Sequence, residues 1–210
     1  MLVSLQLLLV FRGALAVVYA LPGPDMALIL QTRSSHGLKH GLSTAAGLAI
    51  ARTLHVTLSA LGVAALLRNA PWLYDGVRIA GALYLAYVAI QIFRSPAFGL
   101  DDIAMTSKTR PPLRAALSKG VLSSLLNPKA LLFCSVLLPQ FVHPEAGAIW
   151  SQVLELGVVL VVIGAVFDTT LAVSAVRLSR WLRSHPRAQV VQRWTFSVAL
   201  LAFALRLSIE

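Results

Sequence analysis

The sequence predicts an all-α membrane protein with six transmembrane helices, and three observations lead to this class. Of the 210 residues, 58% are hydrophobic and only 12% are charged, with a mean hydropathy of +0.79. Soluble domains have roughly 45–50% apolar and about 25% charged residues. Apolar stretches of membrane-spanning length recur along the chain, and cations gather in alternate loops between them, as in chains that cross a bilayer repeatedly.

Six apolar stretches are long enough to cross a bilayer, which takes about 20 helical residues. They cover residues 2–21 (continuing to about 32), 42–67, 72–93, 115–139, 148–176 and 189–208. These stretches leave no room for a soluble domain, so we expect residues 1–210 to form a single transmembrane domain. The first stretch has no basic region before it and Arg12 interrupts it, so we expect it to be retained and not cleaved as a signal peptide.

The net charge of +10 would suggest nucleic-acid binding in a soluble protein, but here the cations follow the loops. The predicted loops at 31–41, 94–119 and 177–193 carry twelve Lys and Arg residues. The opposite side carries Arg68 and Arg78 around the connection of the second and third stretches, none between the fourth and fifth, and Arg206 near the C-terminus. Because Lys and Arg mark cytoplasmic loops, we expect both termini outside the cytoplasm. We therefore expect the protein to be embedded in the lipid bilayer and not to bind nucleic acid.

Cysteine and histidine usage limits the chemistry. Cys134 is the one cysteine, so no intramolecular disulfide can form and a thiol–disulfide carrier is excluded. The five histidines do not cluster, so the sequence shows no His-rich metal-binding loop. HExxH and GxSxG motifs are also missing from the sequence, which argues against a membrane enzyme. We therefore expect no enzymatic activity, no metal site and no cofactor.

The longest polar stretch, about 94–119, divides the chain into two halves of three apolar stretches each. We place repeat one at about 1–95, a linker at about 96–112 and repeat two at about 113–210. Because each half has an odd number of crossings, the two halves would have opposite orientations in the membrane. The expected architecture is therefore an inverted 3+3 repeat.

Proline interrupts the first apolar stretch of each half. Pro22-Gly23-Pro24-Asp25 lies in the first half, and Asn127-Pro128-Lys129 lies at the matching place in the second. Interrupted segments in corresponding positions of two inverted halves indicate the central binding site of a secondary transporter. The sequence therefore predicts a broken first helix in each half, with a ligand site between the two breaks.

At the first break, the prolines determine where the helix ends and where it restarts. Proline removes a backbone donor and clashes with the carbonyl four residues back, and it disfavours helix at the residue before it. Helix one should therefore stop near residues 19–21 and restart at Pro24, a favourable first helical residue. The restarted helix presents free N–H groups and a positive dipole end, which suit an anionic substrate group. Freed carbonyls on the other side suit a cation.

The chain resembles the lysine exporter and homoserine–threonine resistance family of bacterial amino-acid exporters (LysE/RhtB). The resemblance covers nearly the whole chain. It is carried by PGPDMALIL at 22–30, GLSTAAGLAIARTLHVTLSALGVAALL at 41–67, GALYLAYVAIQIFRS at 81–95 and, most specifically, SKGVLSSLLNPKALLFCSVLLPQFV at 118–142. It implies amino-acid export across the bacterial inner (cytoplasmic) membrane. One departure is Arg52 in ARTLH, where family members often have a small or polar residue, and this argues against a standard preference for cationic amino acids.

Two readings remain open for the residues at the breaks. Asp25 either stabilises the first turn of the restarted helix, or binds a substrate ammonium or a proton. Lys129 either reaches an interface or pairs structurally, or attracts a substrate carboxylate. Asn127 either caps the break or contacts substrate. The predicted substrate-binding set is Pro22, Gly23, Pro24, Asp25, Asn127, Pro128 and Lys129.

Three further polar residues inside predicted spans form the set expected for proton coupling or charge pairing: Arg52, His55 and Asp168. Arg52 and His55 are three residues apart and share a helix face. Asp168 would pair with Arg52 or Lys129, either structurally or as part of a proton relay. His55 is either a proton-coupling group or a hydrogen bonder between helices. Arg12 also needs a partner, for which Glu155 and Asp168 are the candidates.

The function we expect is export of an amino acid or a related small zwitterion, driven by the proton gradient. Its direction and substrate class are implied by the family resemblance. The alternative is export of a metal cation or another small metabolite on the same scaffold, although the scarcity of His, Cys and clustered acids argues against a metal. Small residues at 45/49 and 60/64 give the spacing of close helix packing and permit a homodimer without requiring one.

Overall fold

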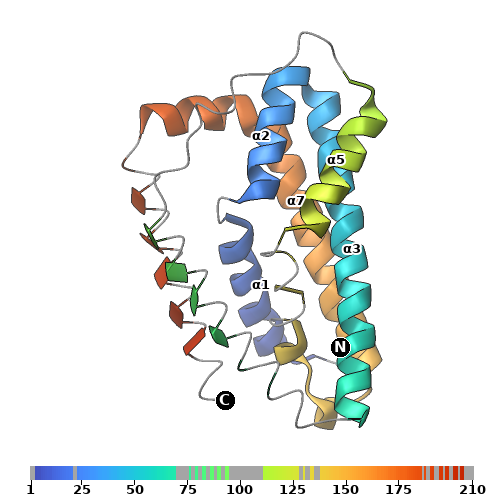
Figure 1. Cartoon of the computed structure of the whole chain (residues 1–210). Coiled ribbons are helices and arrows are strands. Elements are labelled where there is room, and N and C mark those ends of the chain that lie inside the picture. The colour runs from blue at the N-terminus through green and yellow to red at the C-terminus, as the bar shows by residue number, and fades with distance from the viewer. Residues whose placement is uncertain are drawn as a thin grey trace.

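The computed structural model describes residues 3–20, 23–69, 111–127 and 138–185, with single residues between 76 and 94, between 130 and 134, and between 187 and 205. The regular structure of this described part is helical (Figure 1). Its elements are α1 (Leu5–Ala20), α2 (Pro24–His36), α3 (Leu38–Asn69), α5 (Leu113–Leu125), α7 (Ile149–Ser184) and the short 3-10 helices η3 (Leu138–Phe141) and η4 (Pro144–Ala146). The all-α class is therefore confirmed.

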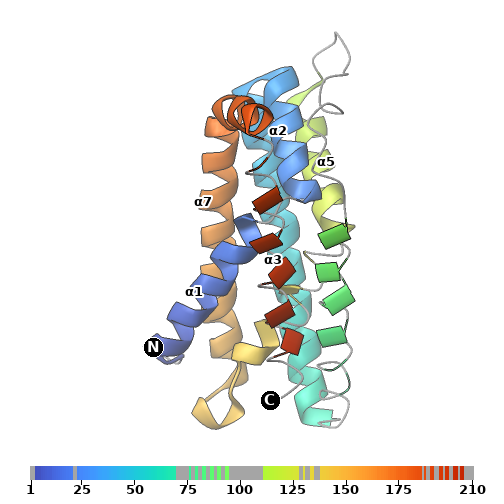
Figure 2. The same ribbon diagram turned by 90° about the vertical axis from the view of Figure 1, so that its left-hand side faces the viewer.

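Among the described residues, α3 and α7 are long and apolar enough to cross a membrane, and α1 with α2 forms a third span if counted as one bent segment. The expected spans 72–93 and 189–208 lie largely outside the described residues. The residues that are described within them have helical backbone, and the rings of Phe93 and Trp194 lie 5.5 Å apart. Figures 1 and 2 show these two segments side by side. The count of six helices and the inverted repeat stay predictions.

The break in the first span lies where the prolines predict it. Helix α1 ends at Ala20 and α2 begins at Pro24, and the two axes differ by 54°. Gly23 precedes α2 in an extended conformation, and its carbonyl accepts the first helical hydrogen bond, from Ala27 at 2.9 Å. Pro24 takes the first helical position, where an N–H has no helical partner in any case. Asp25 then falls in the first turn of α2.

The apolar stretch 115–139, the first of the second half, is also interrupted and is not one continuous helix. Helix α5 ends at Leu125, and the N–H of Asn127 bonds to the carbonyl of Ser124 at 3.1 Å in a closing turn. Asn127 precedes a proline, which disfavours the helical region for its backbone. The break therefore begins at Asn127, as the sequence predicts.

The expected loop at 31–41 is wrong. Helix α2 continues to His36, and α3 already begins at Leu38, with Gly37 alone between them. Gly37 has φ of +94°, a conformation that residues with a Cβ rarely adopt, so one glycine makes the whole turn. Helix α7 likewise runs to Ser184, beyond the expected end at 176. In both places polar residues extend a helix beyond its apolar stretch.

Helices α3 and α5 pack with their backbones in contact through glycines. A Cβ added to Gly120 would collide with the carbonyl oxygen of Thr44, and one added to Gly47 would collide with the carbonyl oxygen of Leu117. Small residues at helix contacts permit this approach within membranes. The glycine pair lies on α3 and α5, which belong to different halves of the chain, so the two halves are joined closely here.

A row of polar side chains on α3 strengthens this contact by donating to backbone carbonyls of α5 and of the segment after it. The donors His40, Ser43, Thr44, His55 and Ser59 bond to the carbonyl oxygens of Pro111, Leu113, Ala116, Ser124 and Cys134, respectively. In lipid, every backbone polar group needs a partner within the protein. The row therefore supplies partners along α5 and into the break that follows it.

Two apolar clusters pack the described helices on either side of the first break. One joins α1, η3 and the first half of α7, with Phe11 and Phe141 in edge-to-face contact at 4.9 Å. The other joins α2, α3 and the second half of α7 through Ile29, Leu48 and Leu171. Because α1 belongs to one cluster and α2 to the other, the break falls where the apolar packing changes, and polar side chains occupy the space between.

The glycine contact gives a prediction on stability. Gly120→Ala should lower the free energy of unfolding by about 1–3 kcal/mol, because its Cβ meets the backbone of Thr44 and the helices must separate. The matched control is Gly62→Ala on α3, where a Cβ meets no atom within 4 Å. The control should keep or slightly raise stability, since alanine favours helix. Thermal unfolding in detergent measures both, and equal midpoints would contradict the close contact.

Candidate functional site

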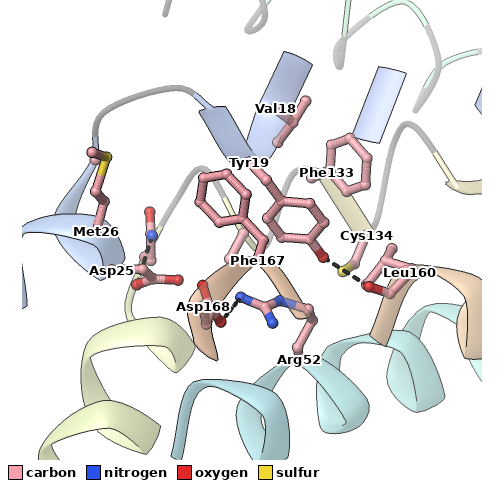
Figure 3. Close-up of a pocket in the computed structure, with 13 residues that line it drawn as sticks. Val18, Tyr19, Asp25, Met26, Arg52, Phe133, Cys134, Leu160, Phe167 and Asp168 are labelled. Atoms are coloured by element: carbon pink, nitrogen blue, oxygen red, sulfur yellow. Dashed lines mark hydrogen bonds and ion pairs between the residues drawn. The ribbon is translucent and has the colours of Figure 1, made fainter. Parts of the chain in front are cut away.

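A small cavity lies at the junction of both breaks, bounded by the end of α1, the start of α2, the middle of α3, the residues after α5, and α7 (Figure 3). Its volume is about 50 Å³. A single water needs roughly 10–15 Å³ on this scale, so the cavity holds a few water-sized groups. It brings together five residues of the predicted sets, namely Gly23, Asp25, Asn127, Arg52 and Asp168.

Asp25 connects the two breaks. Its side chain is half-buried; Oδ1 accepts a hydrogen bond from the Asn127 amide at 3.0 Å, and Oδ2 accepts one from the Ser124 hydroxyl at 3.2 Å. Asp25 also sits in the first turn of α2, where the helix dipole stabilises a negative charge. The carboxylate is therefore held by the N-terminal end of α2 on one side and by the C-terminal end of α5 on the other.

Arg52 and Asp168 form a buried ion pair between α3 and α7. Nη2 of Arg52 donates to Oδ2 of Asp168 at 2.9 Å, and each side chain is only 5% exposed. The guanidinium also lies 4.9 Å from the centre of the Tyr19 ring, close enough for a cation–π interaction. Its other terminal nitrogen, Nη1, is buried and has no hydrogen-bond partner among the described residues. One donor group of a side chain that lines the cavity thus has no acceptor among the described residues.

Tyr19 closes one wall of the cavity. It is the penultimate residue of α1, its ring stacks on Phe167 at 5.8 Å, and its hydroxyl donates to the carbonyl of Leu160 at 3.0 Å. Gly164 makes room for this arrangement, because a Cβ there would collide with the Tyr19 hydroxyl and the Arg52 guanidinium. The end of α1 is in this way fastened to α7 directly above the ion pair (Figure 3).

His55 lies close to the cavity but faces α5. Its Nε2 donates to the carbonyl of Ser124 at 3.2 Å, and one helical turn later Ser59 donates to the carbonyl of Cys134. The last carbonyls of a helix have no partner within it, and α5 ends one residue after Ser124. In this structure His55 satisfies a backbone group that the second break opens.

Several predicted residues lie elsewhere or outside the described part of the chain. Pro24 is exposed at the start of α2. Pro22, Pro128 and Lys129 lie outside the described residues, so a pairing of a substrate between Asp25 and Lys129 stays a prediction.

The candidate partners of Arg12 are engaged with other groups. Glu155 accepts a hydrogen bond from the backbone N–H of Val3 at 3.3 Å, and Asp168 pairs with Arg52. Arg12 itself is exposed on α1. We expected Arg12 to face the protein interior and to need an acidic partner there, but its side chain lies on the exposed face of α1.

Sequence reasoning missed three residues that shape the site: Ser124, Tyr19 and Gly164. Ser124 is three residues before Asn127, so a helical reading would have placed both near the same break. Gly164 is four residues before Asp168, which puts a small residue and an acid on one face of α7. The sequence spacing therefore contains a signal for Ser124 and Gly164. The contact of Tyr19 with α7 depends on the bend between α1 and α2, which sequence spacing does not show.

The ion pair gives a prediction on stability. Asp168→Asn should lower the free energy of unfolding by about 3–5 kcal/mol, because it leaves the buried Arg52 charge uncompensated. The double variant Arg52→Gln with Asp168→Asn removes both charges and should recover most of that loss. Thermal unfolding of the purified variants in detergent compares them. A double variant less stable than the single one would show that the two side chains do not act as a pair.

Known proteins resemble this chain along most of its length. The family model described as LysE type translocator matches residues 16–210. An uncharacterised membrane protein of Pseudomonas aeruginosa is 33% identical over 81% of this chain and 80% of its own. A homoserine/homoserine lactone efflux protein of Salmonella typhimurium is 28% identical over 88% of this chain and 87% of its own. A leucine efflux protein of Klebsiella pneumoniae is 28% identical over 93% of this chain and 91% of its own. No solved structure gives a significant match. The chain belongs to the LysE-type translocator family.

Proposed function

We propose that this chain exports an amino acid or a related small zwitterionic metabolite across the bacterial inner membrane, driven by the proton gradient. Two relatives bear the names of efflux proteins for homoserine, its lactone and leucine, which supports the substrate class. The observation that carries the proposal is the position of Asp25. A carboxylate within the membrane-embedded part of the chain is costly, and here it lies in a cavity formed by both helix breaks.

The charge distribution supports an orientation for the protein. The C-terminal ends of α2 and α7 and the N-terminal ends of α3 and α5 lie at the same end of the molecule (Figure 1). The cations at these ends include Arg33, Lys39, Arg114, Lys119, Arg177 and Arg180. Because Lys and Arg favour the cytoplasmic side, we assign this end to the cytoplasm. The start of α1 and the described residues nearest the C-terminus lie at the opposite end, outside the cytoplasm (Figures 1 and 2).

The contacts of Asp25 support a mechanism by which substrate binding could change the conformation. The hydrogen bonds of Asp25 to Ser124 and Asn127 hold the first break against the second. A substrate ammonium could bind the remaining lone pairs of this carboxylate and would then share it with those two donors, which would weaken the connection between the two breaks. Protonation of Asp25 or Asp168 would change the charge balance of the cavity and so favour one of the two states. Alternating access would follow as the parts of the protein that carry the two breaks move relative to each other about the site.

The role of Asp25 can be tested in proteoliposomes preloaded with labelled leucine, homoserine or lysine. Asp25→Asn keeps the size of the side chain but removes its charge, and should reduce efflux at least about ten-fold, since a charged hydrogen bond contributes about 1.5–3 kcal/mol. Glu145→Gln is the matched control, because Glu145 is an exposed carboxylate in η4, remote from the cavity. Wild-type efflux from a correctly inserted Asp25→Asn protein would remove Asp25 from the mechanism.

Proton coupling predicts a dependence on the pH gradient. An acidic exterior should accelerate efflux from preloaded vesicles compared with equal pH on both sides, because protons entering would drive substrate out. A protonophore should abolish this acceleration while leaving passive leak unchanged, and protein-free vesicles give the leak. Equal efflux rates with and without the gradient would contradict proton coupling, while still allowing export driven by the substrate gradient.

A further inference from the structure

We propose that Arg52 binds the carboxylate of the transported molecule, and that this molecule is an α-amino acid with an uncharged, apolar side chain. The proposal rests on the proposed function and names its substrate class. It replaces Lys129, the residue that the sequence suggested for the carboxylate, with a side chain whose position the structure describes. Three features of the cavity support it: a cationic donor without an acceptor among the described residues, an acid that can accept a further hydrogen bond, and an otherwise apolar lining.

Arg52 lines the cavity, and one of its donors has no acceptor among the described residues. Asp168 engages only Nη2, and Nη1 is buried and makes no hydrogen bond within the described part of the chain. Proteins rarely leave a buried cationic donor without an acceptor, and arginine is well suited to carboxylates because its planar fork offers two parallel donors. A substrate carboxylate beside Nη1 would satisfy this donor. Asp168 would hold the guanidinium in place from the other side.

Asp25 provides the complementary charge. It lies on the same cavity as Arg52, on the side formed by α2, and its oxygens accept one hydrogen bond each in the described contacts (Figure 3). A carboxylate has about four lone-pair positions, so it can accept an ammonium without losing Ser124 or Asn127. An α-amino acid carries an ammonium and a carboxylate on one carbon, which matches an acid and an arginine facing one small cavity.

The remaining lining residues of the cavity favour a substrate with an apolar side chain. Val18, Met26, Phe133, Leu160 and Phe167 line the rest of the cavity with apolar surface. Among the described lining residues, Asp25 and Asp168 are the acids, and Asp168 already pairs with Arg52. A second ammonium, as in lysine, would therefore have no free acid of its own and would meet apolar surface. An aliphatic side chain would be favoured there, and the flexible Met26 can adapt to its shape.

Binding by purified protein in nanodiscs tests this inference directly, with titration calorimetry as the readout. The probes are L-leucine, L-leucinamide, which replaces the carboxylate by a neutral amide, and L-lysine. Wild-type protein should bind leucinamide and lysine each at least about ten-fold more weakly than leucine, since a charged hydrogen bond is lost or a charge is left unpaired. Lysine bound as tightly as leucine would overturn the assignment of an apolar side chain.

The variants separate Arg52 from other carboxylate sites. In the double variant Arg52→Gln with Asp168→Asn, leucine and leucinamide should bind with similar affinity, whereas Arg52→Lys should keep part of the preference for leucine. Arg114→Gln, an exposed cation at the start of α5, is the matched control and should keep the full preference. A full preference in the folded double variant would overturn the role of Arg52 and leave amino-acid export standing. Absence of binding and of transport for every amino acid in a panel would instead overturn the proposed function together with this inference.

Discussion

The need to satisfy backbone polar groups where helices are broken within the membrane governs this structure. A break exposes N–H and C=O groups that lipid cannot satisfy. Helix α3 meets this need on one side, because His55 and Ser59 donate to carbonyls at and after the end of α5. On the other side, the side chains of Ser124 and Asn127 donate to Asp25, so the polar side chains at the break have partners as well. The broken helices are stable because surrounding side chains form the hydrogen bonds that the breaks leave open. The cavity is the space between these side chains.

The same requirement explains why charges are found in this cavity. A buried ion pair contributes little net stability, because desolvation offsets much of the attraction. Arg52 and Asp168 nevertheless sit between α3 and α7 at 2.9 Å, with Tyr19 over the guanidinium and Gly164 making room for it. Under the proposed function, this arrangement is a polar site maintained for a ligand and not a source of stability. The pair lies between two apolar clusters, and each of its side chains is only 5% exposed.

The sequence predicts the class of the fold and the positions of the breaks, because proline acts locally on the residues beside it. The end of α1 at Ala20 and the start of α2 at Pro24 follow from this local chemistry. The single-residue turn at Gly37 was missed, since polarity at 31–41 indicates only that the chain leaves the apolar region. Which acid pairs with Arg52 depends on how α3 and α7 pack across 116 residues of chain, and no local pattern contains that information.

The contact between α3 and α5 has a consequence for movement. The glycines at 47 and 120 bring two backbones together, and the row of α3 donors extends from the start of α5 to the segment beyond its end. Relative sliding of these helices would break several hydrogen bonds at once. Helix α3 is therefore tied mechanically to the second half of the chain although it belongs to the first in sequence. The border between the moving parts would then run through the first half, between α3 and the bent pair α1 and α2, and not through the polar linker.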